Sequence, residues 1–332
     1  MTRPCLIDSA GKIDYGIYPT PISCVNYMDF DLRTPFGKRI PGWIKKVKFN
    51  QFHFIGISAA DLMAGMAVVD LGYVTNGFFY VYDKRNKTFN ETKKTGLPGK
   101  HACIEPYPET PHSRFNTGDL TIQITNSDVH ARTKDMTLDA TLNPSTTTPL
   151  RICTRSGYRG WTYTQKTSPV AISGTITIKG QPYTLDSPDA MATIDWTGGF
   201  MRRNTFWNWA AIATTMPDGR SLGLNLSCGT NETEFNENAF WVNGKKTETG
   251  PVHFRYDDDH FHTPWQVRSR NGKLDLTFYP ETDRREEING LVVASKFRQF
   301  LGTFEGQLKT DDGDTINLDR CPGWAEDHYA KW

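Results

Sequence analysis

The chain has 332 residues, with 38 Lys and Arg against 37 Asp and Glu, so its formal net charge is +1. No long run of like charge gathers these residues into a basic patch, which argues against nucleic acid as a partner. The length is enough to bury a core without metal or disulfide support, and it suits one large or two ordinary domains.

The first thirty residues, beginning "MTRPCLIDSAGKIDYG", contain no apolar run of the length that a signal peptide or membrane helix needs, and no later segment does. We therefore expect a cytoplasmic protein without a transmembrane segment. The cysteines are scattered without C-x-x-C spacing, so we expect six reduced thiols and neither a zinc site nor a disulfide framework. They are Cys5, Cys24, Cys103, Cys153, Cys228 and Cys321.

Apolar residues alternate with polar ones along much of the chain, a period of two that is typical of half-buried strands. In chain order, the clearest runs are 120–125, 136–142, 170–178, 222–226 and 274–278. Turn signals such as "PDGR" at 217–220 and "NG" at 243–244 and 271–272 separate the later runs. Strands joined by tight turns, without long amphipathic helices, predict an all-β protein built from antiparallel meanders.

Strands in this number suit two packed barrels or sandwiches. The Pro- and Thr-rich stretches "TLNPSTTTPLRIC" and "TQKTSPV" are where a boundary between them is expected. We place it near residue 168, which predicts an N-terminal domain over 1–168 and a C-terminal domain over 169–332.

Common catalytic and cofactor motifs are missing from the sequence. There is no G-x-S-x-G elbow for a serine hydrolase and no glycine-rich loop for a nucleotide. His260 and His262 form an H-x-H, but no third metal ligand is identifiable, and we interpret the pair as part of a polar turn. The sequence therefore predicts neither a metal nor a cofactor.

The segment "TIDWTGGFMRRNTFWNWAAI", residues 193–212, is the strongest candidate for a site. On a strand, Asp195 faces away from Trp196, while Trp207 and Trp209 share a face. In a sandwich, the polar face would simply meet solvent; in a barrel, it can line a ligand cavity. The paired tryptophans fit either core packing or a cavity wall.

Residues 160–199 resemble the middle of the hydroxyneurosporene synthase, or carotenoid 1,2-hydratase, superfamily. A tyrosine-rich strand leads to a small-G-T hairpin and then to an aspartate-containing strand that ends in glycine. The whole chain is similar to the domain of unknown function 2804 family. The matching pieces are "AVVDLGYVTNGFFYVYD" at 67–83, "DWTGGFMRRNTFWNWA" at 195–210, "GLNLSCGTNETEFNENAFWVNGK" at 223–245, "PWQVRSRNGKLDLTFYP" at 264–280 and "GWAEDHYAKW" at 323–332.

This resemblance implies two lipocalin-like β-barrels packed together. It also implies a cavity for a hydrophobic substrate, in which an acidic side chain of the relatives protonates a carbon–carbon double bond or the pocket shapes a cyclisation. By position, Asp195 corresponds to the aspartate of the relatives' D-H-x-W-G motif, with Trp196 in place of the histidine. The closest family has no assigned reaction.

A carboxyl group in an apolar cavity has a raised pKa and can hold a proton near neutral pH, which suits Asp195 as an acid. The faces of Trp207 and Trp209 could stabilise a developing carbocation. Arg202 or Arg203 would have the opposite effect, because a cation that reached Asp195 would lower its pKa and form a structural ion pair.

Two main functions remain open: an enzyme of the lyase or isomerase type acting on a lipid- or isoprenoid-like molecule, and a non-catalytic carrier of an apolar small molecule. The enzyme needs a protonatable group with no cation beside it, whereas the carrier needs only an apolar lining. Glycan binding by exposed tryptophans is a weaker third option. The expected ligand-contacting residues are Trp196, Trp207, Trp209, Arg202, Arg203, Asn225, Tyr163 and Trp265, with Asn225 and Tyr163 as orienting polar groups.

The C-terminal segment 323–332 offers a second carboxylate. Glu326 and His328 are two residues apart and share a face if the segment is a strand. One interpretation is a closing strand that Trp324 and Trp332 anchor to a barrel. The other is a second acid/base pair near the pocket.

Overall fold

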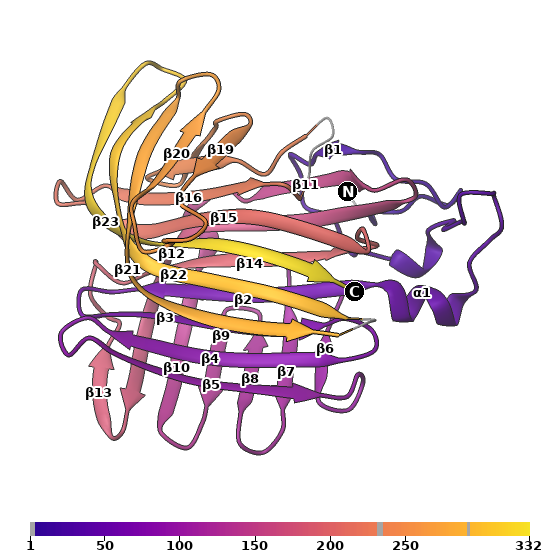
Figure 1. The fold of residues 1–332 in the computed structure, drawn as a ribbon, viewed down its shortest axis with the longest axis horizontal. Helices are drawn as coiled ribbons and strands as arrows, with labels where there is room; N and C mark the ends of the chain where they lie inside the picture. Colours follow the sequence, from indigo (N-terminus) through magenta and orange to yellow (C-terminus); the bar gives the residue numbers. More distant parts are fainter. Residues whose placement is uncertain (1–3, 231–234, 291–292) are drawn as a thin grey trace.

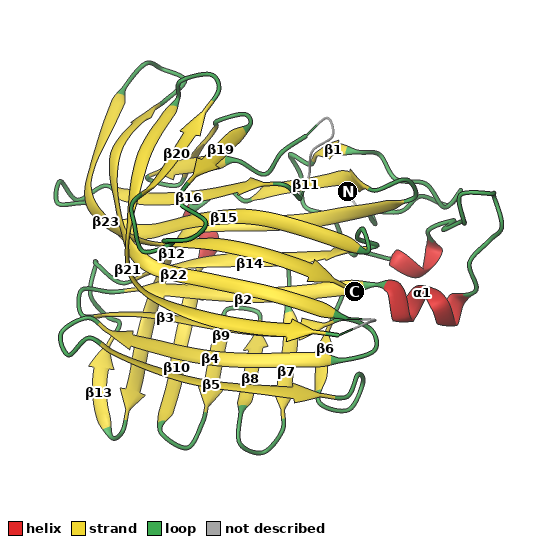
Figure 2. Ribbon diagram, viewed as in Figure 1, coloured by secondary structure: helices red, strands yellow, loops and turns green. Residues whose placement is uncertain are grey.

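The computed structural model describes residues 4–230, 235–290 and 293–332, and almost all of its regular structure is β-strand (Figures 1 and 2). The strands form two antiparallel sheets, the first a nearly closed barrel and the second a half-barrel. This confirms the all-β prediction. The helical elements are α1 (Gly42–Lys48) and the 3-10 turns η1 (Tyr27–Asp29) and η2 (Pro144–Thr146).

The first sheet has fourteen strands, and its main path runs in the order β5-β4-β3-β2-β14-β12-β10-β9-β8-β7-β6. Its strands are β1 (Gly16–Ile17), β2 (Asn50–Ser58), β3 (Leu62–Asp70), β4 (Thr75–Asp83), β5 (Thr88–Gly96), β6 (Ala102–Ile104), β7 (His112–Asn116), β8 (Thr121–Thr125), β9 (Asp128–Arg132), β10 (Met136–Asn143), β11 (Leu150–Ser156), β12 (Gly160–Ile178), β13 (Gln181–Thr184) and β14 (Met191–Gly199).

The second sheet has nine strands in the order β18-β17-β16-β15-β23-β22-β21-β20-β19. Its strands are β15 (Asn204–Thr215), β16 (Ser221–Cys228), β17 (Ala239–Val242), β18 (Lys245–Glu248), β19 (Val252–Arg255), β20 (Trp265–Ser269), β21 (Leu274–Asn289), β22 (Ala294–Lys309) and β23 (Thr315–Lys331). In the described part of the chain, no helix is both long and apolar enough to cross a membrane.

Alternation along the strands decides which side chains fill each barrel. In β2, Ile55 and Ile57 lie in the core of the first sheet, and in β14 Trp196 lies in the same core. In β15, Ala210 and Ile212 belong to the core of the second sheet. The intervening side chains of these strands point out of the barrels.

The outer faces of the two sheets meet, and a third apolar cluster lies between them. Tyr80 of β4, Trp209 of β15 and Trp324 of β23 are its large members, and all three are buried. Figure 1 shows β21, β22 and β23 lying across β2, β3 and β4. The site described below lies at this contact.

The expected division at residue 168 falls inside β12, which continues through it with a β-bulge between Thr167 and Val170. The chain passes from the first sheet to the second after β14, between Gly199 and Asn204. Ser168 nevertheless connects the sheets, since its hydroxyl donates to the carbonyl of Ile212 at 2.7 Å. The boundary near residue 168 between independently folding domains stays a prediction.

The expectation of six reduced thiols is wrong. Cys5 and Cys24 form a disulfide, with their Cα atoms 4.8 Å apart. The segment before the first long strand folds back on itself, and the amide of Leu6 donates to the carbonyl of Cys24 at 2.9 Å. Spacing along the sequence does not reveal this approach, because it is a tertiary contact.

We predict that Gly65→Ala weakens the contact between the sheets. A Cβ atom at residue 65 would lie 2.5 Å from Cζ of Tyr80, too close for the ring to keep its place. Such overpacking typically costs about 1–3 kcal/mol in the free energy of unfolding. Gly42→Ala is the matched control, because its Cβ would meet only the flexible end of Met28. Equal stability of the two variants in urea unfolding would contradict the packing described here.

Candidate functional site

A cavity of about 540 Å³ lies between the outer faces of the two sheets. Apolar atoms make up most of its surface, and charged and other polar side chains also line it. The large rings that line it include Phe52, Phe54 and Phe78 from the first sheet and Trp207, Trp209 and Phe297 from the second. The sequence favoured a cavity inside one barrel, but apolar side chains fill the barrel interiors and the polar faces meet between the sheets.

Strand register brings distant residues together on the first-sheet wall. Lys166 of β12 pairs in register with Asp195 of β14, and Asp195 pairs with Phe54 of β2. The same row continues through Ala67 of β3 to Phe78 of β4. On one face of the first sheet, the charged pair Lys166 and Asp195 therefore lies beside the aromatic ring of Phe54.

The second-sheet wall is built in the same way. Trp209 of β15 pairs with Glu326 of β23, which pairs with Gln299 of β22, which in turn pairs with Arg284 of β21. The next row places Trp207 opposite His328. Glu326 and Gln299 thus lie in one row across the sheet, between Trp209 at one end and Arg284 at the other.

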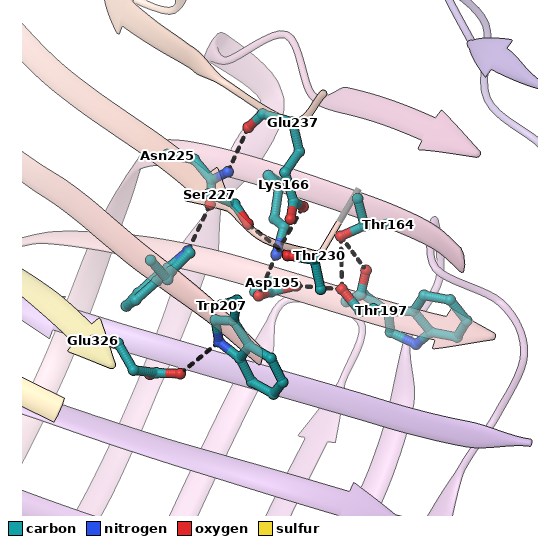
Figure 3. A network of polar contacts seen from close by, with 12 residues as sticks. Thr164, Lys166, Asp195, Thr197, Trp207, Asn225, Ser227, Thr230, Glu237 and Glu326 are labelled. Carbon is teal, nitrogen blue, oxygen red and sulfur yellow. Dashed lines mark hydrogen bonds and ion pairs between the residues drawn. The ribbon is translucent and has the colours of Figure 1, made fainter. Parts of the chain in front are cut away.

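Lys166 is the centre of a buried ionic cluster at one end of the cavity (Figure 3). Its ammonium group pairs with the Asp195 carboxylate and lies 3.4 Å from Oε2 of Glu237. Thr197 donates to Oδ1 of Asp195 at 2.8 Å. The side chains of Lys166 and Glu237 are only 6% and 8% exposed, so these charges interact with little screening by water.

In both Lys166 and Glu237, burial and the nearby opposite charges shift the pKa in opposite directions. For Lys166, burial alone would lower the pKa, but the negative charges of Asp195 and Glu237 outweigh it, and the pKa lies above its ordinary value. For Glu237, burial raises the pKa, and the nearby Lys166 ammonium does not fully compensate. The raised pKa makes Glu237 easier to protonate than a glutamate side chain in water.

A neutral hydrogen-bonded chain links this cluster to the tryptophan wall. The indole of Trp209 donates to Oδ1 of Asn225 at 2.9 Å, and Nδ2 of Asn225 donates to the backbone carbonyl of Glu237 at 2.7 Å. Asn225 is buried and fixes both neighbours.

Glu326 forms a second polar group on the second-sheet wall. Its Oε1 accepts from the indole of Trp207 at 2.8 Å and its Oε2 accepts from Nε2 of Gln299 at 3.1 Å. Tyr80 of the first sheet donates to Oε1 of Gln299 at 2.8 Å and accepts from Trp324 at 3.0 Å. Nδ1 of the neighbouring His328 lies 3.7 Å from Oε1 of Glu326.

The family model for a domain of unknown function, DUF2804, matches residues 2–332. The chain belongs to the DUF2804 family. This confirms the resemblance noted from the sequence motifs.

Two solved structures are similar to this DUF2804 chain. Kievitone hydratase from Nectria haematococca is 11% identical with a TM-score of 0.49, and the match covers 97% of this chain and 98% of that one. A structure described as AttH from Nitrosomonas europaea is 13% identical with a TM-score of 0.48, covering 85% and 92%. At these values, neither likeness bears on activity. No curated protein matches the chain.

Among the residues singled out from the sequence of this DUF2804 protein, the structure brings Asp195, Trp207, Trp209, Glu326 and His328 together around the cavity. Asp195 lies on the opposite face of its strand from Trp196, as the alternation predicts. Asn225 lies behind the wall, where it holds Trp209.

Three aromatic residues that were expected as ligand contacts lie in the barrel cores. Trp196 and Tyr163 belong to the core of the first sheet, and Trp265 belongs to the core of the second, stacked on Tyr256 with 4.0 Å between ring centroids. Side chains alternate between the two faces of a strand, and these three point into the barrels. Large aromatic side chains at such positions are needed to fill the barrels.

Arg202 and Arg203, two further expected ligand contacts, are not among the residues that line the cavity, and they bind other partners than Asp195. Arg202 donates to the carbonyl of Gly229 at 2.9 Å, and Arg203 donates to the carbonyl of Trp332 at 2.8 Å. They hold the turn between the sheets and the end of β23. The cation on Asp195 is Lys166, which sequence reasoning missed.

The C-terminal segment is part of β23, which lies between β15 and β22 and is a central strand of the second sheet, not a closing one. Trp324 is fully buried at the contact between the sheets. Trp332 lies against Phe52, with 5.7 Å between ring centroids, and lines the cavity.

The H-x-H histidines turn to different aspartates. His260 Nδ1 lies 3.2 Å from Asp257, and His262 Nε2 lies 2.9 Å from Asp283. Within the described ranges, no group of three or more His, Cys, Asp or Glu side chains is arranged to hold a metal ion.

We predict a pH-dependent difference between the wild type and Glu237→Gln. Because the pKa of Glu237 is raised above 4.5 in the folded state, the protein binds this proton more tightly when folded. The resulting stabilisation is present at low pH and is lost as the pH rises through the raised pKa. Glutamine cannot ionise, so the free energy of unfolding of the wild type should fall relative to the variant as the pH rises from 4.5 towards neutrality.

Urea unfolding at a series of pH values measures this difference. The exposed Glu287→Gln is the control, and its stability should follow the wild type. Parallel curves for the wild type and Glu237→Gln would show that burial does not favour the protonated form of Glu237.

Proposed function

We propose that this DUF2804 protein binds an apolar small molecule in the cavity between its two sheets. The observation that carries the proposal is the aromatic lining around a space of about 540 Å³, a size suited to a small organic ligand. Apolar atoms make up most of the cavity surface, and polar groups in the walls such as Lys166 and Glu326 are held by neighbouring side chains. This combination suits an apolar body with one or two polar substituents.

The Lys166 cluster is suited to recognise the polar end of the ligand. Asp195 and Glu237 fix the ammonium group at the surface of the cavity. A hydroxyl or carbonyl oxygen of the ligand would accept a hydrogen bond from it. Because the pKa of Lys166 is raised, the amine remains protonated, which argues against imine formation with a carbonyl compound.

We further propose proton-assisted addition to a carbon–carbon double bond, or its isomerisation, with Glu237 in place of Asp195 as the proton donor. Lys166 pairs closely with Asp195 and lies farther, at 3.4 Å, from Glu237, and burial raises the pKa of Glu237, which makes its protonation easier. Glu237 would protonate one carbon, and the cation on the other would face Trp209. Water would then add and return a proton to Glu237, or an adjacent carbon would lose the proton.

A carrier function remains the second candidate, because two groups of polar side chains at the cavity are hydrogen-bonded internally without a ligand. The Trp209–Asn225–Glu237 chain and the Trp207–Glu326–Gln299 group are both internally hydrogen-bonded. Glycan binding has less support. Trp43 is the one tryptophan among the exposed large apolar side chains of the described residues.

We predict that N-phenyl-1-naphthylamine, a neutral apolar fluorophore, binds the wild type and accepts excitation energy from the cavity tryptophans. Val69→Phe should weaken binding about tenfold or more, because Val69 lines the cavity and the larger ring fills it. Val47→Phe on the exposed face of α1 is the matched control and should bind like the wild type. Equal binding by both variants would place the fluorophore elsewhere.

A separate comparison distinguishes the enzyme from the carrier. Organic extracts of purified wild type and Glu237→Gln are analysed by mass spectrometry for small molecules that co-purify. If Glu237 donates the proton, the variant should retain an unconverted compound that the wild type lacks. The same compound in both proteins, and in the Glu287→Gln control, would favour the carrier.

A further inference from the structure

Three polar side chains on the second-sheet wall lie in line at the part of the cavity formed by the ends of β22 and β23. The Ser295 hydroxyl lies 3.1 Å from Nε2 of His328. Nδ1 of His328 lies 3.7 Å from Oε1 of Glu326. All three residues line the cavity. A hydroxyl, an imidazole and a carboxylate in this order are the parts of an activated serine nucleophile.

Strand register explains the alignment. Glu326 and His328 are two residues apart on β23 and share its cavity face, and Phe297 of β22 pairs with His328. Ser295 is two residues before Phe297 and shares the same face of β22. The serine is therefore the diagonal neighbour of the histidine across adjacent strands, within reach of its side chain.

The surroundings of His328 determine which nitrogen carries the proton. Nδ1 is buried and has no hydrogen-bond partner among the described residues, and the nearest carboxylate is that of Glu326. We assign the proton to Nδ1, where it faces that negative charge. This leaves Nε2 unprotonated and able to accept the proton of Ser295.

The imidazole is also in contact with two aromatic rings. Trp207 and Phe297 have centroids 4.1 Å and 4.9 Å from that of His328. Trp207 in addition donates to Glu326, so one side chain positions both the base and its carboxylate. Such support keeps a base oriented without a ligand present.

We propose that Ser295 is a nucleophile activated by His328 and positioned through Glu326, and that the cavity accepts carboxylic esters of apolar acids. This goes beyond the proton-assisted chemistry above and rests on the same proposed cavity. The absence of a G-x-S-x-G elbow does not oppose it, because the same three groups occur on unrelated folds in different chain orders.

The proposed step needs only water as a co-reactant. Ser295 Oγ attacks the ester carbonyl carbon while His328 Nε2 takes the hydroxyl proton. The bond from that carbon to the alcohol oxygen breaks, and the leaving alcohol takes the proton from His328. Water then attacks the acyl-serine with His328 as the base, which releases the carboxylic acid and restores Ser295.

The facing wall offers a donor for the carbonyl oxygen. Arg284 of β21 forms an ion pair with Glu91 of β5, and two residues further along each strand Glu286 forms an ion pair with Lys93. Asn76 of β4, which pairs in register with Thr95 of β5, lines the same cavity as Ser295. Oδ1 of Asn76 accepts from Thr95 at 2.9 Å, which directs its amide hydrogens away from that bond.

Labelling with an alkyl fluorophosphonate tests the proposal without knowledge of the substrate. Such reagents form stable adducts with activated serines. The tryptic peptide 286–296 contains Ser295 as its single serine, threonine or tyrosine, so a mass increase of this peptide identifies the site. We expect the wild type to be labelled there and to hydrolyse p-nitrophenyl butyrate.

Ser295→Ala should abolish both the adduct and the hydrolysis. His328→Gln should slow labelling about 100-fold or more, and Glu326→Gln should lower kcat with little change in KM, as expected of a positioning residue. Ser173→Ala, an exposed position on β12, is the control and should label and hydrolyse like the wild type. Circular dichroism establishes that each variant is folded.

An unlabelled peptide 286–296 in wild type, or equal labelling rates in folded His328→Gln, would overturn the nucleophile proposal. If N-phenyl-1-naphthylamine still binds in that case, the cavity proposal stands without it. If Ser295 is labelled but the fluorophore fails to bind, the nucleophile stands and the apolar-ligand proposal fails.

Discussion

The contact between the outer faces of the two sheets is the constraint on which the site depends. Each barrel needs one face of its strands for its own core, so the faces left to meet carry both aromatic and polar side chains. Buried polar groups are costly unless they are hydrogen-bonded. Tyr80 and Gln299 meet this requirement across the contact, because one donates from the first sheet and the other accepts from the second.

The same requirement explains the composition of the Lys166 cluster. One ammonium group lies between two carboxylates, and burial makes a second full negative charge expensive. Burial, together with the negative charge of Asp195, is the reason that the pKa of Glu237 is raised. The carboxyl group that burial makes easier to protonate is therefore Glu237, a residue that the sequence did not single out.

Local sequence patterns predicted the strands and their faces well. The alternation around Asp195 placed it opposite Trp196, and the spacing of Trp207 and Trp209 placed both on one face of their strand. These inferences rely only on the geometry of one strand. They also made the all-β class predictable, since period-two runs and tight turns are visible without knowledge of which strands pair.

Register and packing could not be predicted in the same way. Lys166 lies opposite Asp195 because β12 pairs with β14 in one register, and a shift by one residue would have turned it into the barrel. The only local signal was a lysine on the same face as Thr162 and Thr164, opposite Trp161 and Tyr163. Trp265 shows the converse error: an aromatic residue in a matching motif was taken as a ligand contact, whereas it fills the second barrel.

The charges in the cavity bear on whether the protein only carries its ligand. An apolar ligand can be held by aromatic walls alone, and each buried ion opposes folding by several kcal/mol before its partners compensate. In a protein that only carried its ligand, apolar residues in place of Lys166, Asp195 and Glu237 would make the folded state more stable. Their positions at the surface of the cavity, and not inside a barrel, mean that a bound molecule would meet them directly. The cost of burying these charges is therefore the physical reason for which we propose that the cluster acts on a ligand as well as binding it.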